Sequence, residues 1–245
     1  MKTFLKLTYM ELKLQLREPV ALFFTLAFPV MVMVLFGFIF GNEADELLGG
    51  YGRVDLSVPG YIGMIVGTIG LLGIPTTLAN YRDLGILRRL RATPLGSSPV
   101  LWSQVAAQVL MTSVGISLLF IAGLTIFGLR IPDGNLAIVP AILLSAFSFF
   151  AVGFVLAGVM PSARTAQAVG MAVFYPMLFL SGAAMPRHIM PDSVQQIAGW
   201  LPLTHVVILV EDLWLKGTWN LTSVAVVVVV LILGLVLSRF TFRWE

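Results

Sequence analysis

Long uncharged runs separated by short charged segments dominate this chain of 245 residues. A helix that crosses a lipid bilayer needs about 20 apolar residues, so the runs between charges define the candidate spans. Helices are expected throughout, because lipid requires backbone polar groups to be hydrogen-bonded within their own segment. We predict six transmembrane helices, at residues 20–40, 59–80, 100–127, 137–160, 166–185 and 220–238. The pattern therefore predicts an all-α integral membrane protein with one transmembrane domain, residues 1–245.

The composition supports this prediction, because 58% of the residues are hydrophobic and only 11% are charged, against about a quarter in a soluble domain. A net charge of +3 does not indicate nucleic-acid binding, since the basic residues are scattered in short loops. The chain has no cysteine, which excludes disulfides and thiolate metal sites. The first apolar run starts near Val20 and is too long for a cleavable signal peptide.

The distribution of lysine and arginine predicts the orientation, because these residues gather on the cytoplasmic side of a membrane. With the N-terminus inside, the inner segments hold 11 of the 15 basic residues. The outer segments hold only Arg53, Arg130, Arg187 and Lys216, and the first outer loop is acidic. The sequence thus predicts a multi-pass protein of the cell (inner) membrane with both termini in the cytoplasm.

Residues 1–19 precede the first span and carry two stripes on a helical wheel. The basic stripe contains Lys2, Lys6, Lys13 and Arg17, and the apolar stripe contains Leu5, Tyr9, Leu12 and Leu16. Glu11 and Glu18 lie on the remaining face, so the amphipathicity is imperfect. We predict a helix in the inner interface, with its basic stripe toward anionic head groups. The alternative is a basic flank that only enforces the topology.

Residues 186–215 are apolar but interrupted by three prolines, so no unbroken piece is long enough to cross the membrane. A capping box at Asp192 and a cap at Thr204 predict two short helices. We interpret them as re-entrant helices in the outer leaflet, where irregular backbone must be covered by protein. An interfacial loop is a compatible alternative, and its anchors would be Trp200, Trp214 and Trp219.

Two spans carry distinctive faces. The second span presents four glycines on one smooth face, which favours close helix packing over a pore: Gly60, Gly63, Gly67 and Gly70. The first span is rich in phenylalanine and methionine. Its Phe24, Phe28 and Met31 are candidates for lining an adaptable path for apolar substrates. The alternative is that these side chains face lipid or neighbouring helices.

Several kinds of chemistry are missing from the sequence. No predicted span carries an ionisable residue at mid-depth, which argues against an ion-driven transporter. His188 and His205 are too isolated for a metal site, and no nucleophile–base set indicates an enzyme. The chain also lacks the GxxxxGK[ST] motif, so it does not bind ATP through a P-loop. Any energy for transport would therefore have to come from another chain.

A charged segment at residues 81–94 follows the second span. Arg88, Arg89 and Arg91 can make charge-assisted hydrogen bonds to a soluble partner. Ile86, Leu87 and Leu90 could fill an apolar groove on that partner. The alternative is an anchor that only keeps this segment inside, but such an anchor needs neither Gly85 nor the Thr93-Pro94 stop.

These features together resemble a known family. The motifs are REP before a span that ends FGFIFG, YRDLGILRRLRATPL after the second span, FLSGAAMP after the fifth and WLPLTH before the sixth. Their order resembles the permease subunits of ABC-2 family exporters, particularly the drug- and antibiotic-efflux branch. The resemblance covers nearly the whole chain.

The resemblance implies a dimer of permeases, most simply a homodimer, driven by two separate ATPase chains that bind ATP and magnesium. It makes residues 82–93 a coupling helix seated in the ATPase. The implied coupling residues are Arg82, Asp83, Gly85, Ile86, Leu87, Arg88, Arg89, Leu90, Arg91 and Thr93. Tyr81 stands where many relatives have an acid, so one ionic contact to the ATPase is expected to be missing.

The resemblance also implies that spans one and five meet across the dimer and that the re-entrant helices close the path. The implied outer gate or dimer interface comprises Ser181, Gly182, Ala183, Pro186, Trp200 and Pro202. The expected function is export of amphipathic drug-like or lipid-like compounds. The alternatives are export of lipid-linked glycans and, from another class, an ATP-independent channel or secondary transporter.

Overall fold

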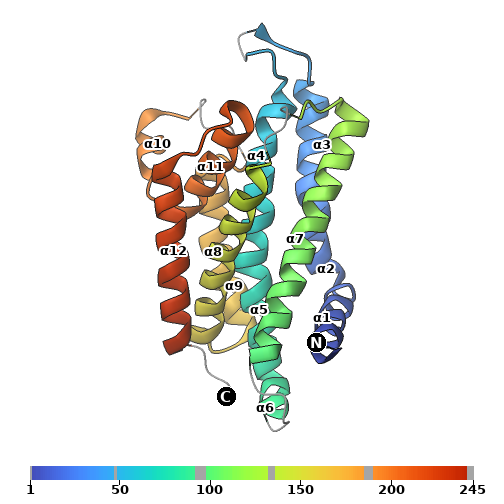
Figure 1. Cartoon of the computed structure of the whole chain (residues 1–245), viewed down its shortest axis with the longest axis vertical. Coiled ribbons are helices and arrows are strands. Elements are labelled where there is room, and N and C mark those ends of the chain that lie inside the picture. Colours follow the sequence, from blue (N-terminus) through green and yellow to red (C-terminus); the bar gives the residue numbers. More distant parts are fainter. Residues whose placement is uncertain (1, 47–48, 92–97, 132–135, 185–189, 242–245) are drawn as a thin grey trace.

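The computed structural model describes residues 2–46, 49–91, 98–131, 136–184 and 190–241, and the regular elements among them are all helices (Figure 1). Two of these, η1 and η3, are π-helical turns. The elements are α1 Lys2–Gln15, α2 Pro19–Leu22, η1 Phe23–Ala27, α3 Phe28–Phe40, α4 Arg53–Thr68, η3 Ile69–Gly73, α5 Ile74–Asp83, α6 Ile86–Arg91, α7 Ser98–Phe127, α8 Ile138–Val159, α9 Ala163–Leu180, α10 Asp192–Ala198, α11 Pro202–Lys216 and α12 Leu221–Thr241.

The predicted all-helical membrane fold is confirmed. Five helices in the described part of the chain are long and apolar enough to cross a membrane. They are Pro19–Phe40, Arg53–Asp83, Pro99–Phe127, Ile138–Val159 and Leu221–Thr241. Helix α9 covers most of the predicted fifth span but is not among the five. The pair α10–α11, bent by 102°, is a sixth candidate if it counts as one span.

The first two spans are each interrupted by a π-helical turn that shortly precedes a proline. In the first span η1 precedes Pro29, and in the second η3 precedes Pro75. Proline has no N–H to bond the carbonyl one turn earlier, so the helix must rearrange there. Each span nevertheless continues through its π turn as one candidate membrane helix, Pro19–Phe40 and Arg53–Asp83.

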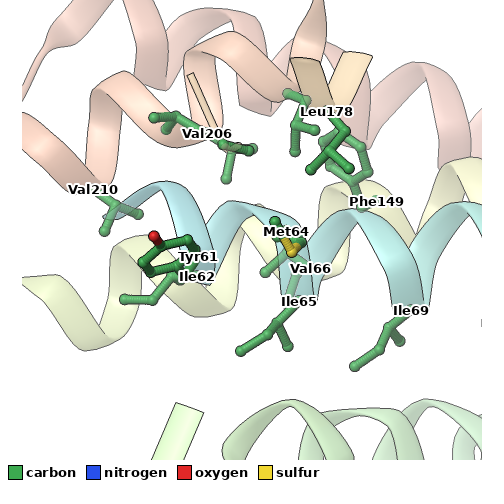
Figure 2. Packing of buried hydrophobic residues seen from close by; sticks show 14 of the residues in the cluster. Tyr61, Ile62, Met64, Ile65, Val66, Ile69, Phe149, Leu178, Val206 and Val210 are labelled. Atoms are coloured by element: carbon green, nitrogen blue, oxygen red, sulfur yellow. The ribbon is translucent and has the colours of Figure 1, made fainter. Parts of the chain in front are cut away.

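The second span is the centre of the molecule, and about three-quarters of its most apolar stretch is buried. Figure 2 shows its buried side chains, among them Ile62, Ile65 and Ile69, together with Phe149 of α8 and Val206 of α11. Helices α3 and α7 contact it on another side. The core of the bundle is therefore built around α4, η3 and α5.

The glycine face of this span is filled by neighbouring elements, which confirms close packing and rules out the pore alternative. A Cβ atom at Gly60 would lie 2.7 Å from the carbonyl oxygen of Gly182, and one at Gly70 would lie 2.6 Å from the Cβ of Phe149. The contact is reciprocal, since a Cβ atom at Gly153 of α8 would lie even closer to the carbonyl oxygen of Gly70. The helices approach this closely because these positions have no side chain.

The N-terminus, α6 and the C-terminal end of α12 lie at one end of the bundle (Figure 1). The connection from α3 to α4 and the short helix α10 lie at the other end. This arrangement brings together the segments that the sequence analysis placed on the inner side. The assignment of that end to the cytoplasm remains a prediction.

Candidate functional site: the basic end of the bundle

The basic segment after the second span is divided into two parts at Gly85. Helix α5 ends at Asp83, Gly85 has a φ of +67°, and α6 begins at Ile86. This left-handed conformation is one that glycine adopts with little steric penalty. The prediction of one helix over residues 82–93 is therefore wrong in its start, because the turn at Gly85 sets α6 apart. Thr93 lies outside the described residues.

Arg82 and Asp83 both make hydrogen bonds to the backbone of their own chain. The Arg82 guanidinium donates to the Ala157 carbonyl at 3.1 Å and also to the Met160 carbonyl, at the C-terminal end of α8. The Asp83 carboxylate accepts the Ala163 N–H at 2.9 Å, at the N-terminus of α9. A cation at a helix C-terminus and an anion at a helix N-terminus both complement the helix dipole. These two predicted coupling residues thus join α5 to the α8–α9 connection.

Helix α6 presents a mixed surface. Arg88 and Arg89 are exposed, whereas Leu87 is only 1% exposed. Leu87 therefore fills a space within its own chain, and its predicted place in a partner's groove is wrong. The apolar side chains that remain accessible to a partner here are Leu84, which is 60% exposed, and the half-buried Ile86. Leu90 and Arg91 lie in the last turn of α6.

Tyr81 connects the N-terminal helix to the second span. Its buried hydroxyl donates to the Glu11 carboxylate at 2.7 Å. Burial raises the pKa of Glu11, and the hydrogen bond from Tyr81 partly opposes that rise. Tyr81 is thus occupied by a contact inside the chain. An acid at this position would face Glu11 and meet charge repulsion.

Helix α1 turns a polar face toward the bundle. Thr8 and Glu11 are buried against it, and α1 runs along α7. Leu5 and Tyr9, from the predicted apolar stripe, are exposed. Lys6 is exposed as well. The face with Thr8 and Glu11 therefore packs against the bundle together with Leu12, whereas Leu5, Tyr9 and Leu16 of the apolar stripe and Lys6, Lys13 and Arg17 of the basic stripe stay exposed.

At the opposite end, the FLSGAAMP segment packs inside its own chain. Ser181 and Ala183 are buried, and the Gly182 carbonyl lies against Gly60 of the second span. The side chains of Ser181 and Ala183 are therefore covered within their own chain, and the predicted role of this segment as an outer gate or dimer interface stays a prediction. Pro186 falls outside the described residues.

The other residues predicted for the outer gate lie near the bend between α10 and α11. Trp200 is 89% exposed, and Pro202, at the first position of α11, is half-buried. Trp219 is also exposed, but Trp214 is buried with its ring near that of Phe120. Two of the three tryptophans are thus placed where they could anchor this region in an interface.

The path candidates of the first span lie beside one another on its surface. The rings of Phe24 and Phe28 are 5.7 Å apart, centroid to centroid, and both side chains are half-buried. Met31 is exposed. Their exposure allows contact with lipid or with another subunit, so a role in the path remains a prediction.

The hydrophobic pattern did not predict a polar cluster at the end of the bundle opposite α6. The carboxylate of the fully buried Asp55 accepts hydrogen bonds from the Asn42 amide (2.9 Å), the Gly52 N–H (2.8 Å) and both the backbone and side chain of Arg130. Asn42 also donates to the Phe127 carbonyl at 3.1 Å. This outer knot (Asn42, Gly52, Asp55 and Arg130) joins the ends of the first three spans. Asn42 and Asp55 flank the loop between the first two predicted spans. Two polar residues at the ends of neighbouring spans were the one sequence feature that could have indicated this cluster.

The described residues contain no group of three or more histidine, cysteine or carboxylate residues placed to hold a metal ion. His205 is held between two elements instead. One ring nitrogen lies 2.9 Å from the Gly199 carbonyl and the other 3.3 Å from the Ser223 hydroxyl. This histidine thus ties the start of α11 to α10 and α12.

Comparison with known proteins gives the class. A family model described as ABC-2 type transporter matches residues 3–213, so the chain belongs to this family. It is 24% identical to YvfS of Bacillus subtilis, named as a transport permease, over 95% of this chain and 94% of that protein. It is 25% identical to the daunorubicin resistance ABC transporter permease protein DrrB1 of Streptomyces coeruleorubidus, over 86% and 74%. Nodulation protein J of Bradyrhizobium diazoefficiens is 36% identical over 33% and 31%.

Proposed function

We propose that this chain is the membrane subunit of an ATP-driven exporter for amphipathic drug-like or lipid-like compounds. Two copies would form the path in the cell (inner) membrane, with both termini in the cytoplasm. Two separate ATPase chains would bind ATP and magnesium. Membership of the ABC-2 family supports the class, and the name of the relative DrrB1 supports amphipathic cargo.

The observation that carries the proposal is the position of α6. This short helix lies at the same end of the bundle as the N-terminus and exposes Arg88 and Arg89 (Figure 1). Exposed guanidinium groups bind carboxylates of a partner through charge-assisted hydrogen bonds. Leu84, exposed beside them, adds an apolar contact. The surface thus has the mixed character of a protein-binding site rather than a plain basic anchor.

Contacts within the chain connect α6 and the preceding turn to the rest of the bundle. Leu87 is buried in the chain, and Arg82 and Asp83 bind the α8–α9 connection. A push on α6 would therefore act on the second span and on α8 and α9 together. We infer that ATP-driven closure of the partner subunits changes the packing of these three helices as one unit.

The test is charge reversal on α6. We expect the double variant R88E/R89E to lose at least about tenfold in affinity for the ATPase, since each lost charged hydrogen bond is worth about 1.5–3 kcal/mol. Substrate-stimulated ATP hydrolysis in proteoliposomes and co-purification of the two proteins measure the loss. Arg239→Glu is the matched control, because Arg239 is exposed near the C-terminal end of α12. Wild-type assembly and hydrolysis in the double variant would contradict the proposal.

A further inference from the structure

Helix α10 is attached to the rest of the molecule by few contacts. It spans only Asp192–Ala198, and Ala198 is the one buried residue among these seven, all of which the structure describes. A helix this short is not stable by itself, so its neighbours must hold it in place. It packs against α9, and the chain then bends by 102° between α10 and α11. The contacts across this bend therefore decide where α10 lies.

His205 reaches back across the bend from α11. Its Nε2 atom lies 2.9 Å from the carbonyl oxygen of Gly199, the residue at the C-terminal cap of α10. A carbonyl oxygen can only accept, so this contact is a hydrogen bond only when Nε2 carries the proton. The neutral ring then has a free electron pair on Nδ1, which can accept a hydrogen bond. The Gly199 carbonyl thus selects one tautomer of His205.

The second ring nitrogen connects the bend to the last span. Nδ1 lies 3.3 Å from the hydroxyl oxygen of Ser223, near the start of α12. Ser223 is 1% exposed, so its hydroxyl has almost no access to water and donates to Nδ1 instead. The hydroxyl therefore donates to the ring, and the ring donates to the Gly199 carbonyl. Consecutive hydrogen bonds of this kind strengthen one another, and here they join α12, α11 and α10.

A separate set of contacts fixes α11 to α12 without the histidine ring. The Asp212 carboxylate accepts hydrogen bonds from the Asn220 amide at 2.8 Å and from the Lys216 ammonium group at 2.7 Å. Asn220 in turn accepts the Ser223 N–H at 3.0 Å. The two helices also pack against each other. They therefore form a pair that does not depend on His205, and the particular contribution of the ring is to attach α10 to this pair.

We propose that His205 is a positioning residue that makes α10 move with the α11–α12 pair. While the ring bonds the Gly199 carbonyl, α10 and the adjoining Trp200, which is 89% exposed, keep one position relative to α12. The bond to Gly199 lies at the surface, whereas the partner on α12 is buried, so water can replace the first bond more easily than the second. The attachment is thus reversible at α10. Without it, α10 follows its contacts with α9.

The inference deepens the proposed function, and only its consequence for transport rests on that function. Helix α10 lies at the end of the bundle opposite α6, where an exporter would release its cargo (Figure 1). If the last span moves during transport, an attached α10 moves with it. The attachment itself is a property of this chain alone and needs neither nucleotide nor ATPase. The exporter is tested by R88E/R89E and the attachment by the position of α10, so the two can fail separately.

The test measures the distance between α10 and α12 in the full chain. The sequence has no cysteine, so spin labels attach only at two introduced cysteines, Q196C and L233C, at exposed positions. Pulsed electron paramagnetic resonance in phosphatidylcholine nanodiscs gives the distribution of this distance, which should be narrow while His205 is present. H205N should raise the population at displaced distances about two- to tenfold, because its amide can reach Ser223 but not Gly199.

Two further variants separate the two bonds of the ring. The side-chain amide nitrogen of H205Q can occupy the position of Nε2 and donate to the Gly199 carbonyl, so we expect it to restore the narrow distribution. S223A removes the hydroxyl that orients the ring and should give a smaller shift than H205N. Its matched control is S238A on the same helix, because the Ser238 hydroxyl bonds the Leu235 carbonyl of α12 itself.

The consequence for transport is measured in the complex with the ATPase subunits, trapped with ATP and vanadate. Labels at Q196C and A172C report the distance from α10 to the exposed face of α9. We expect trapping to change this distance in the wild type and to leave the distance from α10 to α12 unchanged. In H205N the change should appear between α10 and α12 instead. If trapping changes neither distance, the role in transport is wrong.

Two results would overturn the attachment itself. One is a distribution in H205N as narrow as that of the wild type, and the other is a distribution in H205Q as broad as that of H205N. If H205N does not fold, S223A decides the question, because it removes a single hydroxyl. A broader distribution in S223A than in S238A would then support the attachment, and equal distributions would refute it.

Discussion

At the scale of single residues, several charged side chains bind partners within their own chain. Arg82 and Asp83 bind helix ends of their own chain, and Glu11 accepts the Tyr81 hydroxyl. The sequence could show that charges stand here, but not what they meet, because each partner is 70 or more positions away. Arg88 and Arg89, in contrast, keep the exposure that was expected.

Glu11 should make the docking of α1 depend on pH. A carboxyl group whose pKa is raised by folding binds its proton more tightly in the folded state, so its contribution to stability falls as pH rises through the raised pKa. The pH range in which this stability is lost therefore begins at 4.5, the ordinary pKa of a glutamate, and extends upward to the raised pKa of Glu11. We expect the Tm of the wild type, relative to that of E11Q, to fall as pH rises through this window.

Melting curves of the two proteins in detergent at several pH values measure this difference. The side-chain amide in E11Q can still accept the Tyr81 hydroxyl, so the variant isolates the charge. E18Q serves as the control, because Glu18 is exposed. Parallel pH profiles for the wild type and E11Q would show that Glu11 carries no buried charge.

At the scale of elements, hydrophobic runs located five of the six predicted spans, α9 at the fifth not being among the candidates, while tertiary contacts decided the short elements. The predicted spans overlap the observed helices because lipid leaves the backbone little choice. The face on which α1 packs and the position of Gly182 against Gly60 both depend on neighbours distant in sequence. Gly85 was noted in the sequence, but its role as a break depends on its positive φ.

Replacing Gly85 should affect coupling more than stability. An alanine at a φ of +67° costs about 1–2 kcal/mol, and no atom lies within 4 Å of the added Cβ, so the strain is confined to the turn. We expect G85A to reorient α6, to reduce substrate-stimulated ATP hydrolysis strongly and to lower the Tm only by a few degrees, about what a loss of 1–2 kcal/mol gives. Gly73→Ala is the control, because its φ is helical and its nearest contact is 3.9 Å away. Equal hydrolysis in both variants would refute this role of the turn.

At the scale of the whole molecule, one glycine-faced helix organises the bundle, as the spacing of its glycines predicted. The sequence could not identify the elements that pack there, because they come from α8, α9, α11 and the segment after α9. That segment brings a backbone carbonyl, at Gly182, against Gly60. This contact explains why a motif expected at a subunit interface is used inside the subunit.

An added methyl group on this helix should be tolerated less well at Gly60 than at Gly63. A Cβ at Gly60 meets a carbonyl oxygen at 2.7 Å, whereas one at Gly63 meets a Val207 methyl group at 2.8 Å, and a side chain shifts more easily than a backbone. We expect G60A to lose about 1–3 kcal/mol of stability, as over-packed cores do, and G63A to lose less. Thermal unfolding of both variants in detergent measures the difference. A smaller loss of stability in G60A than in G63A would contradict the observed packing.

The outer knot gives the bundle a fixed pivot. Because Asp55 and Asn42 hold three spans together at one end, those spans cannot slide past one another there. The second span has 31 residues and therefore forms a lever about 46 Å long. A displacement of about 5 Å at α6 would turn that lever by only about 6°. The ends of the three spans at the outer knot would stay nearly in place. A force applied at α6 would then move their opposite ends apart.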